Sequence, residues 1–283
     1  MKVLITGANG QLGQDITRLC KTKDIPCYAA DSKVLDITSK KRVDEMIRTY
    51  SPDVIINCAA YNAVDLAEKE WKNAFMVNGF GVKNLALAAN EQGSILVHYS
   101  TDYVFDGKSD RPYTIIDPVH PVNRYGESKL FGEQVVRDLC NRYYLIRTSW
   151  VFGKGKTNFV LKMLEWCQGK TEIPVVDDQI SAPTYTVDLA KATLDLISTR
   201  SFGLYHITNS GNCSRYDWGR YIVAQTGWNG TLHKVKSDTF RTAAQRPGYS
   251  VLDTFGTEET LGYTLPTWQD ATLRYLKEIG VIP

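Results

Sequence analysis

The sequence lacks several features that would place it in particular classes of protein. Its 33 lysines and arginines almost balance its 31 aspartates and glutamates, which leaves a net charge of +2, and it contains no long run of like charge. Proteins that track nucleic-acid phosphates normally carry a basic stripe. We therefore expect no nucleic-acid partner. Internal repeats and low-complexity tracts, the marks of solenoids and disordered tails, are also missing.

Long apolar segments and paired cysteines are missing as well. Residues 1–7 are apolar for only a few positions, too short for a signal peptide or a membrane span, so we expect no membrane partner. The six cysteines form no C-x-x-C pair, and no other spacing indicates a metal site. We expect reduced thiols and a cytoplasmic location. The cysteines are Cys20, Cys27, Cys58, Cys140, Cys167 and Cys213.

What the sequence does contain is an alternation of strand and helix signals. With 283 residues, 43% of them hydrophobic, the chain can bury a sizeable core. Short apolar runs bounded by Gly, Pro or Asp are typical of strands buried on both faces, and they occur at residues 3–5, 27–30, 54–58, 95–99 and 144–146. Stretches with helical spacing lie between them, at residues 12–20, 42–49, 71–89 and 127–139. The pattern predicts an α/β protein with a Rossmann-like, doubly wound parallel sheet.

The alternation of predicted strands and helices becomes less regular after residue 149. Helices are predicted near residues 158–168, 187–198, 216–226 and 267–279, strands at 173–176 and 204–207, and residues 238–266 are expected to be irregular. We expect residues 1–149 to form a dinucleotide-binding domain. Residues 150–283 are expected to form mainly a smaller, partly interleaved substrate-binding lobe over the carboxyl edge of the sheet, with segments that return to the first domain.

A glycine-rich turn directly follows the first predicted strand and opens the first helix. Glycine lets the backbone turn sharply and approach a pyrophosphate, whose charge meets free N–H groups at the helix start. A plain strand-to-helix turn is the alternative interpretation, although the position of the turn favours the dinucleotide site. The candidate cofactor residues here are Gly7, Asn9, Gly10, Gln11, Leu12 and Gly13.

Asp31 ends the second predicted strand, about 20 residues beyond the turn, where such folds place a carboxylate on the adenosine ribose. This favours NAD, yet Ser32 and Lys33 follow, and a hydroxyl with an ammonium suits a 2′-phosphate. The choice of cofactor therefore stays open at this point. Further residues at predicted strand ends would border a flat ligand, or would merely pack strand against helix: Asp36, Ile37, Ala59, Ala60 and Tyr61.

Three residues form a candidate catalytic set. Tyr125 and Lys129 are spaced i, i+4, so they project from one face of the predicted helix, and an adjacent ammonium would lower the phenol pKa toward the range of a general acid–base. Thr101 ends the fourth long strand, where its hydroxyl could bond a carbonyl oxygen that gains charge. A tyrosine and a lysine can have this spacing by chance on a helix surface. Because the pair occurs together with the glycine turn and Thr101, chance is the minor alternative.

At this point the chain resembles the extended short-chain dehydrogenase/reductase family, in which a Thr or Ser, a Tyr and a Lys serve these roles. Within it, the motifs are similar to those of the dTDP-4-dehydrorhamnose reductase family over nearly the whole chain. Asn62 departs from the Thr that is more common in that family. The segments that carry the resemblance are residues 57–61, 63–65, 67–68, 98–107, 125–129, 147–152, 178–179, 182–184, 246–247 and 250–253.

The resemblance implies reduction of the 4-keto group of dTDP-4-dehydro-L-rhamnose to dTDP-L-rhamnose, for surface polysaccharide synthesis. It implies NADPH as the cofactor, with NADH tolerated, and a monomer or homodimer. Tyr125 would deliver the proton, and Lys129 would hold the nicotinamide ribose. The implied substrate residues are Thr101, Asp102, Tyr103, Val104, Trp150 and Arg246, the last as a ligand of the diphosphate.

Two other functions remain open at this stage. A nucleotide-sugar epimerase or dehydratase would share the fold and the Thr/Tyr/Lys set, but dehydratases usually carry Asp-Glu after the Thr, where this chain has Asp102-Tyr103. A non-catalytic regulatory subunit would keep the fold and bind a partner enzyme. The intact Thr101, Tyr125 and Lys129 argue against it.

Overall fold

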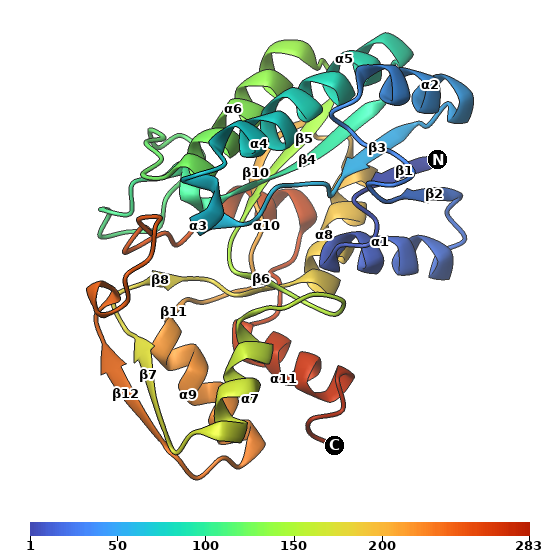
Figure 1. The fold of residues 1–283 in the computed structure, drawn as a ribbon. Coiled ribbons are helices and arrows are strands. Elements are labelled where there is room, and N and C mark those ends of the chain that lie inside the picture. Colours follow the sequence, from blue (N-terminus) through green and yellow to red (C-terminus); the bar gives the residue numbers. More distant parts are fainter.

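A six-stranded parallel sheet forms the centre of the upper lobe in the computed structural model, which describes residues 1–283 (Figure 1). The strands lie in the order β10-β5-β4-β3-β1-β2, and every pairing is parallel. This confirms the predicted Rossmann-like fold. The strands are β1 (Val3–Thr6), β2 (Cys27–Ala30), β3 (Val54–Asn57), β4 (Ile95–Thr101), β5 (Tyr143–Thr148) and β10 (Gly203–His206).

Helices cover both faces of this sheet (Figure 1). Successive residues of β1 point to opposite faces: Val3 and Ile5 join one apolar cluster, and Leu4 joins another. That is why the strands read as continuous apolar runs rather than as an alternation. One face carries α1 (Gln11–Thr22) and α8 (Thr186–Thr199), and the other carries α2 (Lys40–Tyr50), α5 (Val82–Gln92) and α6 (Arg124–Leu139).

The second lobe lies below the carboxyl ends of the strands and has its own apolar cluster (Figure 1). Trp218, Phe152 and Tyr275 are fully buried at its centre, where the Phe152 ring contacts the other two edge-on. The parallel pair of β7 (Glu172–Val176) and β12 (Thr231–Val235) flanks this cluster. Its helices are α7 (Phe159–Gly169), α9 (Arg215–Thr226) and α11 (Trp268–Glu278).

The chain crosses between the lobes more than once. Although β10 and α8 lie far beyond residue 150, β10 pairs with β5 at the sheet edge and α8 packs against α1. The remaining short elements connect the lobes or end loops: α3 (Val64–Ala67), η2 (Asp102–Val104), β6 (Val151–Phe152), β8 (Ile180–Ser181), β9 (Thr184–Tyr185), β11 (Cys213–Ser214) and η3 (Ser237–Thr239).

Two segments differ from the sequence-based prediction. The single helix expected over residues 71–89 is α4 (Trp71–Phe75), a π-helical stretch (Met76–Gly81) and α5. Gly79 lies so close to α6 that a Cβ there would overlap the Phe131 ring, so close packing with α6 accompanies the wider turn. The tail expected to be irregular contains a two-turn helix, α10 (Phe255–Leu261), which packs against α8 and β10.

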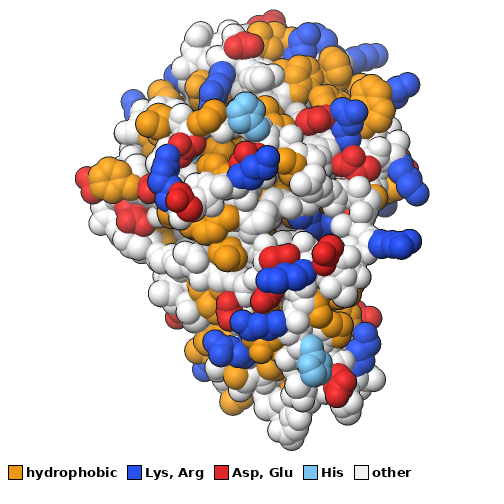
Figure 2. All heavy atoms as spheres, turned by 90° about the vertical axis from the view of Figure 1, so that its left-hand side faces the viewer, with side chains coloured by type: hydrophobic (Ala, Val, Ile, Leu, Met, Phe, Trp, Pro, Cys, Tyr) orange, Lys and Arg blue, Asp and Glu red, His pale blue; other side chains and the backbone are white.

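The surface carries mixed charge. Figure 2 shows basic and acidic side chains interspersed with hydrophobic ones on one side of the molecule. None of the helices has both the length and the apolar character needed to cross a membrane. The structure contains no group of three or more His, Cys, Asp or Glu side chains arranged to hold a metal ion.

Candidate active site

A cavity of about 800 Å³ lies between the two lobes, at the carboxyl ends of the central strands. Parallel α/β sheets bind their ligands at this edge. The cavity brings together most of the residues predicted from the sequence: Gly7, Asn9, Gly10, Gln11, Leu12, Gly13, Asp31, Ser32, Asp36, Ile37, Ala59, Ala60, Thr101, Asp102, Tyr103, Tyr125, Lys129 and Trp150.

Three of the predicted site residues do not line this cavity. Tyr61 donates its hydroxyl hydrogen to Glu70, 3.1 Å away. Val104, the last residue of η2, is fully buried in a small apolar cluster. Arg246 forms a two-pronged ion pair with Asp65, at 2.6 and 3.1 Å.

The turn after β1 has the close contacts that require glycine. Gly7 adopts φ +61°, and a Cβ on it would lie 2.5 Å from the backbone nitrogen of Ala59. A Cβ on Gly13 would lie 2.6 Å from the carbonyl oxygen of Gly7. No side chain caps the first turn of α1, so its N–H groups are left for a ligand. The backbone here fits a pyrophosphate.

Both carboxylate oxygens of Asp31 are occupied within the protein. One accepts hydrogen bonds from the backbone N–H groups of Lys33 and Val34, at 2.9 and 3.0 Å, and the other accepts from the side-chain amide of Asn9, at 2.7 Å. Asp31 therefore shapes the loop after β2 and ties it to the glycine turn. Lys33 lines the cavity beside it.

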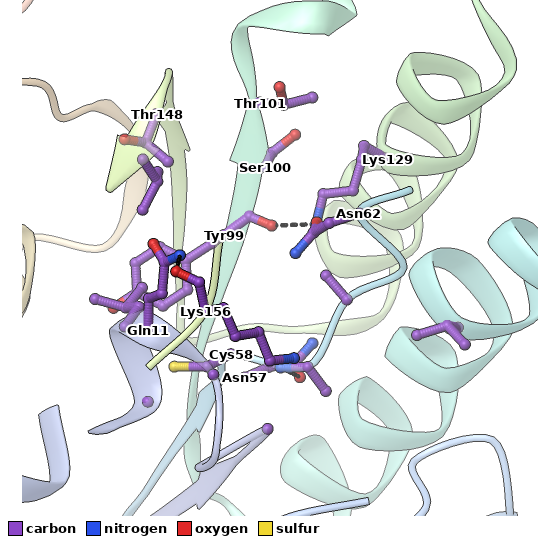
Figure 3. A pocket seen from close by; sticks show the side chains of 18 of the residues that line it. Gln11, Asn57, Cys58, Asn62, Tyr99, Ser100, Thr101, Lys129, Thr148 and Lys156 are labelled. Atoms are coloured by element: carbon purple, nitrogen blue, oxygen red, sulfur yellow. Dashed lines mark hydrogen bonds between the residues drawn. The ribbon is translucent and has the colours of Figure 1, made fainter. Parts of the chain in front are cut away.

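Lys156 is a cavity residue that sequence reasoning missed, and it is visible in Figure 3. It lies in the loop between β6 and α7, and its carbonyl oxygen accepts a hydrogen bond from the Gln11 side chain at 3.0 Å. This contact joins the second lobe to the glycine turn. No local spacing marks Lys156, because its loop lies far along the chain from the turn.

Thr101 ends β4 and caps the short helix η2. Its hydroxyl oxygen accepts a hydrogen bond from the backbone N–H of Tyr103 at 3.1 Å, and its hydroxyl hydrogen is donated to Asp102, 3.0 Å away. Ser250 and Ser181 also donate to the Asp102 carboxylate, at 2.5 and 3.3 Å. Burial raises the pKa of Asp102 to about 6, and the hydroxyl donors limit that rise.

Tyr125 and Lys129 lie in the first turns of α6, which Asn123 caps by accepting from the N–H of Gly126 at 2.8 Å. Burial raises the pKa of Tyr125, and the nearby Thr101 hydroxyl partly opposes that rise. The Tyr125 ring packs edge-on against Tyr103, with ring centroids 5.8 Å apart.

The Lys129 ammonium donates to the backbone carbonyl of Tyr99 at 2.5 Å, the bond that Figure 3 marks. Burial lowers the pKa of Lys129 to about 8. The cation is therefore held against β4 and is easier to deprotonate than an exposed lysine.

Trp150 and Arg215 line the cavity from the second lobe. Trp150 has a left-handed backbone with φ +42°, uncommon for a bulky residue, and its ring stacks on Trp218 with centroids 6.0 Å apart. The guanidinium carbon of Arg215 lies 3.5 Å from the centroid of the Trp150 ring. Sequence reasoning missed Arg215, a lone arginine at the start of a helix.

The glycine turn on β1, with Thr101 on β4 and the Tyr125/Lys129 pair on α6, defines an extended short-chain dehydrogenase/reductase. More narrowly, residues 1–281 match the family described as RmlD substrate binding domain. The chain belongs to this family of NAD(P)-dependent dTDP-sugar reductases.

Individual relatives agree with this assignment over their full length. The spore coat polysaccharide biosynthesis protein SpsK of Bacillus subtilis is 40% identical, with 98% of this chain and 97% of the relative covered. A crystal structure of a dTDP-4-dehydrorhamnose reductase from Clostridium acetobutylicum is 39% identical, with a TM-score of 0.96 and 99% of each chain covered. The dTDP-4-dehydrorhamnose reductase of Bacillus anthracis, solved in complex with NADP, is 39% identical, with a TM-score of 0.94 and 98% and 100% covered.

Proposed function

We propose that this protein uses NADPH to reduce the 4-keto group of dTDP-4-dehydro-L-rhamnose, giving dTDP-L-rhamnose for a surface polysaccharide. The observation that carries the proposal is a single cavity that joins the glycine turn to Thr101, Tyr125 and Lys129. A relative that binds NADP and a relative named for spore coat polysaccharide support the cofactor and the role.

The cofactor fits the first-lobe half of the cavity. The N–H groups at the start of α1 would meet the pyrophosphate, and Lys33 with Ser32 would meet the 2′-phosphate. Lys129 would hold the nicotinamide ribose. When bound, NADPH supplies the hydride that adds to C4 of the sugar.

The protein's own residues would supply the proton that the reduced sugar oxygen needs. Because burial keeps the Tyr125 phenol protonated at neutral pH, Tyr125 holds the proton that O4 of the sugar needs. The indole of Trp150 would border the sugar and exclude water from the reacting atoms.

The decisive experiment measures how much cofactor is oxidised for each sugar molecule converted. We expect one NADPH to be oxidised for each dTDP-4-dehydro-L-rhamnose converted, with much slower oxidation for a UDP-hexose that has no 4-keto group. An epimerase or dehydratase would convert sugar without net oxidation, because the cofactor is regenerated in each cycle. A regulatory subunit would bind cofactor and leave every 4-keto sugar unchanged.

A further inference from the structure

Arg215 has an unusual combination of surroundings. Its guanidinium carbon lies 3.5 Å from the ring centroid of Trp150, and 5.1 and 5.7 Å from those of Phe159 and Trp218. Stacking uses the faces of a guanidinium and leaves its N–H groups free around the edge. The guanidinium forms no ion pair and no side-chain hydrogen bond; burial lowers its pKa to about 10, and the nearby charge of Asp102 partly opposes that fall. It is thus held flat in the cavity wall with its donors unused.

Other charged groups near this end of the cavity are already paired. Arg246 is bound to Asp65 through two nitrogens, and it also donates to the carbonyl of Ala244. The Asp102 carboxylate is surrounded by hydroxyl donors from Thr101, Ser181 and Ser250. Arg215 is therefore the cation at this end of the cavity that is free to meet a ligand.

A partly buried guanidinium is stabilised when acceptors satisfy its donors. The ligand that fits it carries several anionic oxygens spaced for a planar fork, and a diphosphate has this arrangement. Lys33 and Lys156 lie at the glycine-turn end, where they would meet the cofactor. A diphosphate bound to Arg215 would belong to the second nucleotide, the one that carries the sugar.

We propose that Arg215, and not Arg246, is the arginine that binds the diphosphate of the nucleotide sugar. This inference rests on the proposed function, because it assumes a nucleotide diphosphate sugar as the substrate. Trp150 and Phe159 act on the diphosphate through Arg215: their rings fix the plane of the guanidinium before the ligand arrives. Such preorganisation strengthens binding, because the entropy cost of ordering a long side chain has already been met in the free protein.

The experiment measures binding, so that it does not depend on turnover. Calorimetric titration of the NADP-loaded protein with dTDP and with thymidine separates the diphosphate from the nucleoside. We expect Arg215→Gln to weaken dTDP binding at least about tenfold, the worth of a charged hydrogen bond, and to leave thymidine and NADP binding unchanged. Arg215→Lys, which keeps the charge, should recover part of the loss.

Matched controls decide between the outcomes. Arg220→Gln removes an exposed arginine from the same helix and should change no affinity. Equal dTDP binding by Arg215→Gln and wild type would overturn the proposal, as would a wild type that binds dTDP no better than thymidine. A variant that loses affinity for dTDP-L-rhamnose but not for dTDP would place Arg215 on the sugar, and it too would overturn the proposal. Failure of the proposed function would appear separately, as absence of NADPH oxidation with intact dTDP binding.

Discussion

Thr101 donates its hydroxyl hydrogen to the carboxylate of Asp102 across 3.0 Å. A threonine expected to stabilise a developing negative charge on a substrate oxygen thus has its one proton directed at a buried acid. Whether that proton is available to the substrate depends on what Asp102 accepts from its other neighbours, Ser181 and Ser250. Asp102 is therefore a positioning residue for Thr101, and it connects this residue to the second lobe.

The first prediction uses the raised pKa of Asp102. Its value of about 6 lies above the ordinary 3.8, so between these pH values the folded protein binds a proton that the unfolded chain does not. The contribution of Asp102 to the free energy of unfolding therefore falls as pH rises through this window. Asp102→Asn removes the effect, so the stability of the variant relative to wild type should improve by about 2 kcal/mol from pH 4 to pH 7.

Urea unfolding of both proteins at the two pH values gives this difference directly. Comparing the variant with wild type cancels the contributions of all other titrating groups. A difference that stays constant with pH would show that Asp102 is ionised with an ordinary pKa, in conflict with its burial.

The second prediction concerns Tyr125. Replacing it by Phe removes the hydroxyl and leaves the ring packed on Tyr103. Turnover should fall roughly a hundredfold or more, the usual effect of losing a positioned acid, while NADP affinity and melting temperature are retained. Tyr50→Phe, on α2 and far from the cavity, is the control and should have normal kinetics. Near-normal turnover of Tyr125→Phe would refute the assigned role.

The third prediction concerns the choice of cofactor. Because Asp31 is bonded to its own loop and to Asn9, we expect Lys33 to have the larger effect on the 2′-phosphate. Lys33→Ala should raise the KM for NADPH about tenfold, and the KM for NADH should change little. Lys83→Ala, an exposed lysine on α5, tests for a general charge effect. If instead Asp31→Ala improves NADPH use relative to NADH and Lys33→Ala does not alter the ratio, the carboxylate is the discriminator.

The fourth prediction compares two glycines in one turn. Gly7→Ala forces a left-handed backbone on alanine and drives its Cβ into the Ala59 backbone, so the free energy of unfolding should fall by roughly 1–3 kcal/mol or more. Gly10 has φ −76°, and its Cβ would meet only the Gly7 carbonyl, at 3.1 Å. Gly10→Ala should therefore cost clearly less. Equal melting temperatures for the two variants would contradict this account.

Much of the fold could be predicted because its signals are local. The strands of the main sheet are short apolar runs, and the turn at Gly7 and the Tyr125/Lys129 spacing each lie within a few residues. The π-helical stretch could not be predicted, since the wide turn occurs where Gly79 meets Phe131 of another helix. The wide helical turn accompanies a tertiary contact, and the hydrophobic periodicity of a sequence does not indicate such contacts.

The residues on the second-lobe side of the cavity could not be predicted for the same reason: their roles depend on contacts between distant parts of the sequence. Arg246 and Asp65 are far apart in the sequence, so nothing local indicates that Arg246 is already paired. Arg215 likewise belongs to no sequence motif. Its candidate role depends on the stacked Trp150 ring, which lies far from it in the sequence. Val104 follows Tyr103 directly but packs into an apolar cluster, because successive side chains of the 3-10 helix η2 point about 120° apart.

The position of β10 at the edge of the main sheet also has a consequence for synthesis of the protein. Translation proceeds from the N-terminus at about 5–20 residues per second, so β5 is complete seconds before β10 leaves the ribosome. During that interval β5 is an open edge strand with unpaired backbone groups and apolar side chains, the kind of edge on which chains aggregate. A nascent chain that stalls before Gly203 would therefore leave this edge open to other chains.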